Sequence, residues 1–334
     1  MIDLPSTVRA LIGKPWLVRS CRSEARLDNK TIIVTGANTG IGKEAAAEFA
    51  RRGGRVILAC RSESKGEAAA EDIRRTCNNE NVVFKKLDLA SFKSIREFAQ
   101  DINENEKSLD ILVNNAGLVV SRTLTEDGLE MIMGVNHFGH FLLTNLLLDK
   151  IKQTPKARIV VVASHGYSLV RHINFDDIQN EKDFSSINVY CQSKLANVYF
   201  TRSLAKRLES HGVIVNTLHP GAVRTDIWRN MYTVVKVITY PFFLLLFKSC
   251  KQGAQTTIHL AISEEVEGIT GQYFENCRQV PLKPHALDDE VAERLWKVSE
   301  EITGLSPSST NALPSSTNAS PSSTNASPSS STAI

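Results

Sequence analysis

The amino-acid sequence predicts an α/β fold, a single domain built on a parallel, doubly wound sheet with helices on both faces. Two observations support this prediction. Short runs of continuously apolar residues recur along the chain, and segments of helical character separate them. Continuous apolar runs are typical of strands buried on both faces, and a regular alternation of strands with helices predicts parallel pairing. The length of 334 residues suits one large α/β domain or two smaller ones.

Each predicted element follows from one of these runs. The predicted strands cover residues 31–34, 55–59, 82–87, 111–113, 159–163 and 213–218, with a last strand at residues 271–274. The predicted helices cover residues 42–53, 64–77, 91–105, 126–152 and 188–210, and an amphipathic helix at residues 288–304 closes the domain. Ligands of doubly wound sheets bind beyond the carboxyl ends of the strands, so we expect the functional residues there.

Composition and charge narrow the function. With 42% hydrophobic and 22% charged residues, the chain reads as globular. Residues 1–30 carry six Lys/Arg against three Asp/Glu, whereas residues 31–304 carry 33 of each. The neutral core does not suggest a nucleic-acid-binding surface. The six cysteines show no metal-ligand or redox spacing, and we expect them to be reduced thiols in a cytosol-facing protein.

The two ends of the chain differ from the core. Residues 1–28 form a basic and apolar arm without the ~20 apolar residues of a spanning helix and without a signal peptide. Two interpretations stay open, an arm packed on the domain and an amphipathic segment lying on an anionic membrane. A mitochondrial presequence is less favoured because of Asp3 and Glu24. Residues 305–334 repeat a Ser/Pro/Thr/Asn-rich unit and are predicted to be disordered.

A glycine-rich stretch marks the first functional site. Residues 35–42 read T-G-A-N-T-G-I-G and join the first predicted strand to an Ala-rich helix. Glycine lets the backbone turn tightly and approach a phosphate, while a helix N-terminus offers free N–H groups and a partial positive charge. A plain turn is the alternative, but the strand before and the helix after favour a pyrophosphate-binding loop.

Three further motifs follow in order: N-N-A-G at residues 114–117, Ser164, and Y-x-x-x-K at residues 190–194. Together with the glycine stretch they resemble the short-chain dehydrogenase/reductase family, classical branch, over roughly residues 29–280. The resemblance implies a Rossmann-type fold in a domain of residues 29–304, with a substrate lid at about residues 222–252. Two segments, G-V-N-H-F-G-H-F at residues 134–141 and Y-C-Q-S-K-L at residues 190–195, resemble the corresponding segments of the retinol dehydrogenase group, which acts on retinoids and other lipid aldehydes.

The second strand indicates which cofactor is used. An acidic residue after it would bind the ribose hydroxyls and repel a 2′-phosphate, but Arg61 stands there, with Lys65 and Lys43 nearby. We therefore expect NADP(H) in preference to NAD(H). Loop positions, and the family resemblance for several of them, complete the expected cofactor-binding set: Gly36, Asn38, Thr39, Gly40, Ile41, Gly42, Arg61, Lys65, Asp88, Leu89, Asn115, Ala116, Gly117, Tyr190, Lys194, Pro220, Gly221, Val223 and Thr225.

Carbonyl reduction needs a proton donor and a hydrogen bond to the developing oxyanion. A tyrosine titrates at about 10, and a nearby ammonium lowers that value. Tyr190 and Lys194 are four residues apart on a predicted helix and so share a face. Ser164, at the end of a strand, is placed to hold the substrate oxygen. The resemblance adds Asn136 as the holder of a water in the proton relay, which makes the expected catalytic set Asn136, Ser164, Tyr190 and Lys194.

Two neighbouring histidines, His137 and His140, lie at i, i+3 on one predicted helical face. No carboxylate or third ligand accompanies them, so we expect packing or surface residues and no metal site.

The run at residues 237–247 bears on the substrate, since it is uncharged and flanked by Lys236 and Lys248. Eleven residues cannot span a bilayer, which leaves a buried helix or an apolar wall of the substrate site in contact with a membrane. We expect an NADP(H)-dependent oxidoreductase that interconverts a lipophilic aldehyde or ketone and its alcohol, with retinal and retinol implied by the resemblance. The alternatives are a catalytically silent cofactor-binding scaffold and a steroid or quinone reductase.

The expected partner is therefore a lipophilic small molecule, with no nucleic acid. Peripheral membrane contact and a homo-oligomer stay open. The expected location is intracellular and cytosol-facing, with peripheral attachment to the endoplasmic reticulum membrane left open and a mitochondrial location less favoured.

Overall fold

The computed structural model describes residues 19–223 and 248–305. Five predictions lie wholly or partly outside these residues: the basic arm up to residue 18, the substrate lid at about residues 222–252, Thr225 and the apolar run at residues 237–247 within that lid, and the repeat tail from residue 306. They stay predictions.

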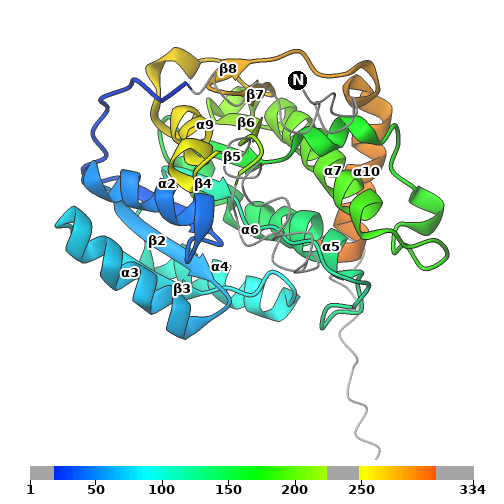
Figure 1. The fold of residues 1–334 in the computed structure, drawn as a ribbon, viewed down its shortest axis with the longest axis horizontal. Coiled ribbons are helices and arrows are strands. Elements are labelled where there is room, and N and C mark those ends of the chain that lie inside the picture. Colours follow the sequence, from blue (N-terminus) through cyan, green and yellow to red (C-terminus); the bar gives the residue numbers. More distant parts are fainter. Residues whose placement is uncertain (1–18, 224–247, 306–334) are drawn as a thin grey trace, which may run out of the picture.

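One eight-stranded sheet with the order β3-β2-β1-β4-β5-β6-β7-β8 forms the centre of the fold (Figure 1). Strands from β3 to β7 pair in parallel, and β8 closes an antiparallel hairpin with β7. The seven predicted strands are confirmed, whereas β8, with two residues, was not predicted. The strands are β1 (Thr31–Thr35), β2 (Arg55–Cys60), β3 (Val82–Lys86), β4 (Ile111–Asn114), β5 (Arg158–Val162), β6 (Ile214–His219), β7 (Tyr273–Glu275) and β8 (Arg278–Gln279).

Helices cover both faces of the sheet, which confirms the predicted fold class (Figure 1). One apolar core joins one face of the sheet to α2 (Gly40–Arg51), α3 (Glu63–Cys77) and α9 (Cys250–Ile262). A second core joins the opposite face to α4 (Phe92–Asn105), α6 (Gly139–Gln153), α7 (Ser186–Arg207) and α10 (Asp289–Thr303). Among the α-helices of the described residues, α9 alone was not predicted; Gly253 and two threonines weaken its helical pattern, but a Ser249–Gln252 capping box begins it.

The helix predicted at residues 126–152 begins later and is not uniform. It consists of α5 (Met131–Met133), a π-helical turn η1 (Gly134–Phe138) and α6. The Glu130 carboxylate accepts the N–H groups of Ile132 and Met133 and so sets the start. π-Helical turns are rare and frequently lie at functional sites, and this one carries Asn136.

The same continuous helix, Met131–Gln153, is the one described helix long and apolar enough to cross a membrane by length and composition. Of its most apolar window, 78% is buried inside the fold. Such burial is what a helix packed against a sheet shows.

The last helix, α10, packs beside α7 (Figure 1). The Arg207 guanidinium lies 3.9 Å from the centre of the Trp296 ring, and its Nη2 lies 2.6 Å from the Glu293 carboxylate. The Trp296 ring stacks on Phe200 of α7. These contacts make α10 part of the second core.

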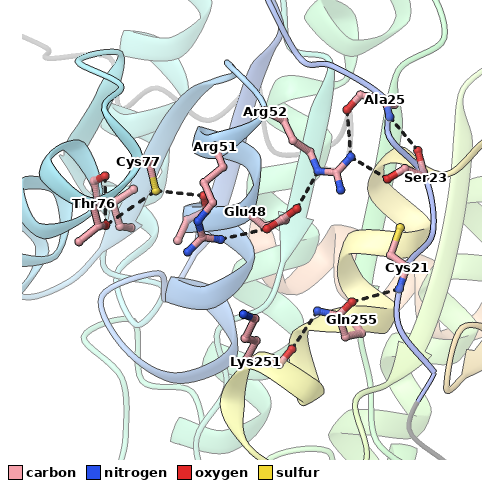
Figure 2. Close-up of polar contacts among 12 residues, drawn as sticks. Cys21, Ser23, Ala25, Glu48, Arg51, Arg52, Thr76, Cys77, Lys251 and Gln255 are labelled. Carbon is pink, nitrogen blue, oxygen red and sulfur yellow. Dashed lines mark hydrogen bonds and ion pairs between the residues drawn. The ribbon is translucent and has the colours of Figure 1, made fainter.

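The N-terminal strap, residues 19–27, runs across α2 and α9 before β1 begins (Figure 2). The Cys21 N–H donates to Gln255 Oε1 of α9 at 3.0 Å. The Cys277 thiol, in the turn between β7 and β8, donates to the Arg19 carbonyl at 3.7 Å. The strap therefore joins α2, α9 and the edge hairpin.

Arg52 is the main anchor of the strap, and its loss should destabilise the fold. Its Nη1 donates to the Ser23 and Ala25 carbonyls at 2.8 and 3.1 Å, and its Nε pairs with Glu48 (Figure 2). We expect R52A to lower the free energy of unfolding in urea by about 2 kcal/mol. The neighbouring Arg51 has only an exposed pair with Glu48, so R51A should cost less than about 1 kcal/mol. Equal losses in the two variants would contradict this assignment.

Candidate active site

The expected site residues in the described part of the chain lie on the side of the sheet where the parallel strands end. Each follows the carboxyl end of a strand or lies on a helix that packs against that side, as the topology requires. The order is residues 36–42 after β1, Arg61 after β2, Asp88 and Leu89 after β3, residues 115–117 after β4, Ser164 after β5, and Pro220 and Gly221 after β6.

The glycine loop after β1 has the backbone that its sequence predicts. Gly36 and Gly40 have φ values of +65° and +62°, a region that other residues rarely adopt. A Cβ on Gly42 would lie 2.5 Å from the Asn115 side-chain nitrogen, so the loop packs tightly on the β4 end. The first N–H groups of α2 have no partner within the helix and face the end of the loop. These residues therefore fit a dinucleotide pyrophosphate.

Cys60 contacts the backbone of the glycine loop. Cys60, the last residue of β2, is 2% exposed, and its sulfur accepts the N–H groups of Ala37 and Asn38. Burial raises the pKa of the Cys60 thiol to about 11, so the group is neutral at physiological pH. Cys60 was expected only as a reduced thiol, and its contact with the loop was not predicted.

The three positively charged side chains expected near the end of β2 differ in whether they form an ion pair. Arg61 and Lys65 are exposed and form no ion pair with another described residue. Lys43, which was expected nearby as a further positive charge, instead pairs with Asp72 of α3 at 2.8 Å. Lys43 is therefore neutralised by α3, and Arg61 and Lys65 are the cations left at this end of the site.

The ends of β1 and β4 are held together by one threonine. Thr35 Oγ1 accepts the N–H groups of Asn115 and Ala116, each at 2.9 Å. In return, the Asn115 side-chain amide donates to the Thr35 carbonyl at 2.8 Å. The N-N-A-G segment is thus fixed beside the glycine loop.

The structure brings the expected catalytic residues together. The Ser164 and Tyr190 side chains share a hydrogen bond. Lys194 Nζ lies 5.5 Å from the centre of the Tyr190 ring and donates to the Val162 carbonyl at 3.1 Å. A Cβ on Gly117 would lie 3.3 Å from this Nζ, so only glycine leaves the space beside the ammonium open.

Asn136 joins the group through its side chain. Its Oδ1 accepts the Leu118 N–H at 2.9 Å, and its Nδ2 donates to the Leu118 carbonyl and to Ser193 Oγ, each at 3.1 Å. Ser193 in turn donates to the Tyr190 carbonyl at 2.7 Å. Sequence reasoning missed Ser193, although its place between Tyr190 and Lys194 was a signal. The side chain of Asn136 is fully used, which leaves its backbone carbonyl for the predicted relay.

The pKa values differ from the expected direction. Burial around the hydroxyl raises the pKa of Tyr190 to about 12, against the opposing effect of the Ser164 hydrogen bond. The expectation that Lys194 lowers it is wrong for this structure, because burial outweighs an ammonium that is bonded to the Val162 carbonyl. Burial also lowers the pKa of Lys194 to about 8. At neutral pH the phenol is protonated and most of the lysine is charged.

Tyr190 packs against the third apolar cluster of the fold. Leu118, Val120, Val170 and Phe175 are further partly buried residues that pack against the same cluster. Two of these, Val170 and Phe175, come from the long segment between Ser164 and Tyr190.

The long segment itself is held in place by side chains outside it. Gln192 of α7 accepts the Asn174 N–H at 3.0 Å, and Arg122 donates to the Asn180 carbonyl at 3.1 Å. These two bonds fix the segment to α7 and to Arg122.

Val223, after β6, pairs with Lys248, before α9. Gly221 has a φ of +92°, and Val223 forms a parallel bridge with Lys248. The Lys248 N–H donates to the Ala222 carbonyl at 2.8 Å, and its Nζ donates to Asn276 Oδ1 at 2.9 Å. Both ends of the segment that contains Thr225 are thus fixed beside the site.

His137, in the π-helical turn, and His140, in the first turn of α6, are buried packing residues, and neither lies on the surface. His137 is 1% exposed and His140 2% exposed. They do not share a face as predicted: His137 meets Ser299 of α10, whereas His140 meets Thr35 of β1. The π-turn between them changes the phase of the helix. Burial lowers the pKa of His137 to about 4 and that of His140 to about 3.

Comparison with known proteins supports the same assignment of motifs. A family profile described as short chain dehydrogenase matches residues 30–234, which include every expected catalytic residue. Retinol dehydrogenase 13 of Homo sapiens is 49% identical over 291 residues, covering 85% of this chain and 88% of that protein. Retinol dehydrogenase 12 of Mus musculus is 46% identical over 285 residues, covering 85% of this chain and 89% of that protein. A solved structure of an uncharacterized protein from Mycobacterium Paratuberculosis has a TM-score of 0.67 and 32% identity, covering 86% of this chain and 98% of that chain.

The buried histidines predict acid sensitivity. In the unfolded chain they titrate near 6.5, but His137 and His140 stay neutral in the folded state down to pH values of about 4 and 3. Their contribution to stability is complete above pH 6.5 and is lost as the pH falls, because only the unfolded state binds the protons. Well below pH 6.5 each should cost about 1.4 kcal/mol per pH unit.

Urea unfolding between pH 5 and 7 checks this prediction. H137F should remove one histidine and reduce the slope of unfolding free energy against pH by about 1.4 kcal/mol per unit at the acidic end. An unchanged slope in H137F would show that His137 is protonated in the folded protein.

Proposed function

Because this chain belongs to the short-chain dehydrogenase family, we propose that it is an NADP(H)-dependent oxidoreductase that interconverts a lipophilic aldehyde or ketone with its alcohol, retinal and retinol being the pair to test first. The observation that carries the proposal is the assembly of Tyr190, Ser164 and Lys194 beside the glycine loop. The relatives named retinol dehydrogenase support the substrate class.

The nicotinamide cofactor of this family supplies or accepts the hydride when it is bound. The loop at residues 36–42 and the N-terminus of α2 would hold its phosphates. Arg61 and Lys65 are the described cations able to receive a 2′-phosphate, which supports NADP(H). Gly117 leaves room beside Lys194 for the ribose.

In the direction of reduction, the chain must supply one proton to the carbonyl oxygen. Tyr190, with a pKa of about 12, is protonated at neutral pH and can donate it. Ser164 can hydrogen-bond the same oxygen as it gains negative charge. The Lys194 ammonium lies close enough to stabilise the phenolate that remains. Oxidation of the alcohol uses the same groups in reverse.

A lipophilic substrate fits the surroundings of the phenol. The apolar cluster that includes Leu118, Val120, Val170 and Phe175 adjoins Tyr190 and would bury a hydrocarbon chain. Of these, Val170 and Phe175 belong to the segment fixed by Gln192 and Arg122.

Replacing Tyr190 tests the chemistry. Y190F should lower kcat by about 100-fold or more, because it removes the proton donor, and should leave NADPH binding within about threefold of wild type. The measurement is NADPH consumption in detergent with all-trans-retinal and with a medium-chain aldehyde. Y199F is the control, since Tyr199 lies on the same helix and bonds only the distant His285 carbonyl.

Two results would contradict the proposal. Full activity of Y190F would exclude this mechanism. NADPH binding without turnover of any carbonyl would favour the silent cofactor-binding scaffold.

Replacing Arg61 tests the cofactor preference. R61A should raise the KM for NADPH by about 10-fold, through loss of a charge-assisted bond to the 2′-phosphate, while the KM for NADH changes little. K43A is the matched control, because Lys43 already pairs with Asp72. If R61A and K43A alter the two KM values alike, Arg61 does not select the cofactor.

A further inference from the structure

His140 is a buried histidine with a hydrogen-bonding partner at each ring nitrogen. Its Nδ1 lies 3.3 Å from the Asn136 carbonyl, and its Nε2 lies 2.9 Å from Thr35 Oγ1. A carbonyl oxygen can only accept, so the proton of the ring belongs on Nδ1. Nε2 then carries the lone pair, and the Thr35 hydroxyl must donate to it.

The contacts of Thr35 agree with this assignment. Its oxygen already accepts two N–H groups, from Asn115 and Ala116, so its own proton is the one left to donate. The Val113 carbonyl lies 3.4 Å away, farther than His140 Nε2. The bonds that link Asn115 and Ala116 through Thr35 and His140 to the Asn136 carbonyl therefore all run in one direction.

Burial and the neighbouring groups keep the ring neutral. Burial is the largest cause of the lowered pKa of His140, and Lys194 of α7 and His137 of the same helix act in the same direction. A protonated ring could not accept from Thr35, so neutrality is a condition of the network.

We propose that His140 is a positioning residue that holds the Asn136 backbone carbonyl in place for catalysis and ties it to the cofactor loop. The side chain of Asn136 is bonded to Leu118 and Ser193, so its carbonyl is the acceptor left to hold the water of the proton relay, and His140 Nδ1 is the donor that fixes the direction of this carbonyl. This inference rests on the proposed function.

His137 provides a matched control on the same helix. It is equally buried and also has a lowered pKa, but its Nε2 lies 2.9 Å from Ser299 Oγ of α10, away from the site. Loss of either imidazole creates a comparable defect in packing. Only His140 should affect the reaction.

The kinetic test compares H140F, H140N and H137F in the full chain. H140F should lower kcat at least 10-fold while NADPH affinity stays within threefold, because Thr35 keeps its two N–H bonds. H140N should recover most of the loss, since its amide nitrogen can replace Nδ1 as the donor to Asn136. H137F should keep kcat within threefold despite a similar drop in melting temperature.

A double-mutant cycle tests whether His140 acts through Asn136. In the N136A background the carbonyl is already released from its side-chain anchors, so H140F should cost less than a third of its effect in wild type. Additive losses, a failure of H140N to recover activity, or an equal loss in H137F would each overturn the inference.

A spectroscopic readout separates this inference from the proposed function. Nitrogen-15 NMR of histidine-labelled protein should show His140 as the neutral Nδ1–H form from pH 7 down to pH 5, with T35V altering the Nε2 signal. A charged ring or the Nε2–H form would overturn the inference even if carbonyls are reduced. A confirmed Nδ1–H form with no carbonyl turned over would reject the proposed function and leave the hydrogen-bonding network intact.

Discussion

The parallel pairing of β1 with β4 decides where the site can be built. Helices that follow β1 and β2 cover one face of the sheet, and those that follow β3 and β4 cover the other. The chain therefore leaves these two neighbouring strands toward opposite faces, and a crevice opens between the exits. Gly36 and Gly117 stand on its two sides. The Thr35 hydroxyl accepts the N–H groups of Asn115 and Ala116. It therefore fixes the glycine loop after β1 relative to the N-N-A-G segment after β4.

Burial is the dominant electrostatic influence on Tyr190 and Lys194, the proposed catalytic pair. It raises the pKa of Tyr190 and lowers that of Lys194, so each group is pushed toward its neutral form. Removing polar groups from water is costly unless each finds a partner. Asn136, Ser193 and Thr35 meet that requirement with backbone groups of neighbouring elements. The same bonds that satisfy these groups also fix their directions, which is what proton transfer over short distances requires.

Much of this arrangement could be read from the sequence, because it depends on local patterns. Apolar runs located the parallel strands, and the four-residue spacing placed Tyr190 and Lys194 on one face of a helix. The partner of Lys43 could not be read, because Asp72 comes from another helix. The role of His140 was missed for a related reason: its partner Thr35 lies 105 residues away, and a π-turn alters the helical phase on which the prediction relied.

The bridge between Val223 and Lys248 has a consequence for how such a protein can diversify. Val223, shortly after β6, and Lys248, shortly before α9, lie side by side. The Lys248 N–H donates to the Ala222 carbonyl, and the Lys248 ammonium donates to Asn276 Oδ1. The entropic cost of closing a loop grows only slowly with its length. The number of residues between Val223 and Lys248 can therefore change at little cost in stability, because both ends of the insertion stay fixed to the same place on the fold.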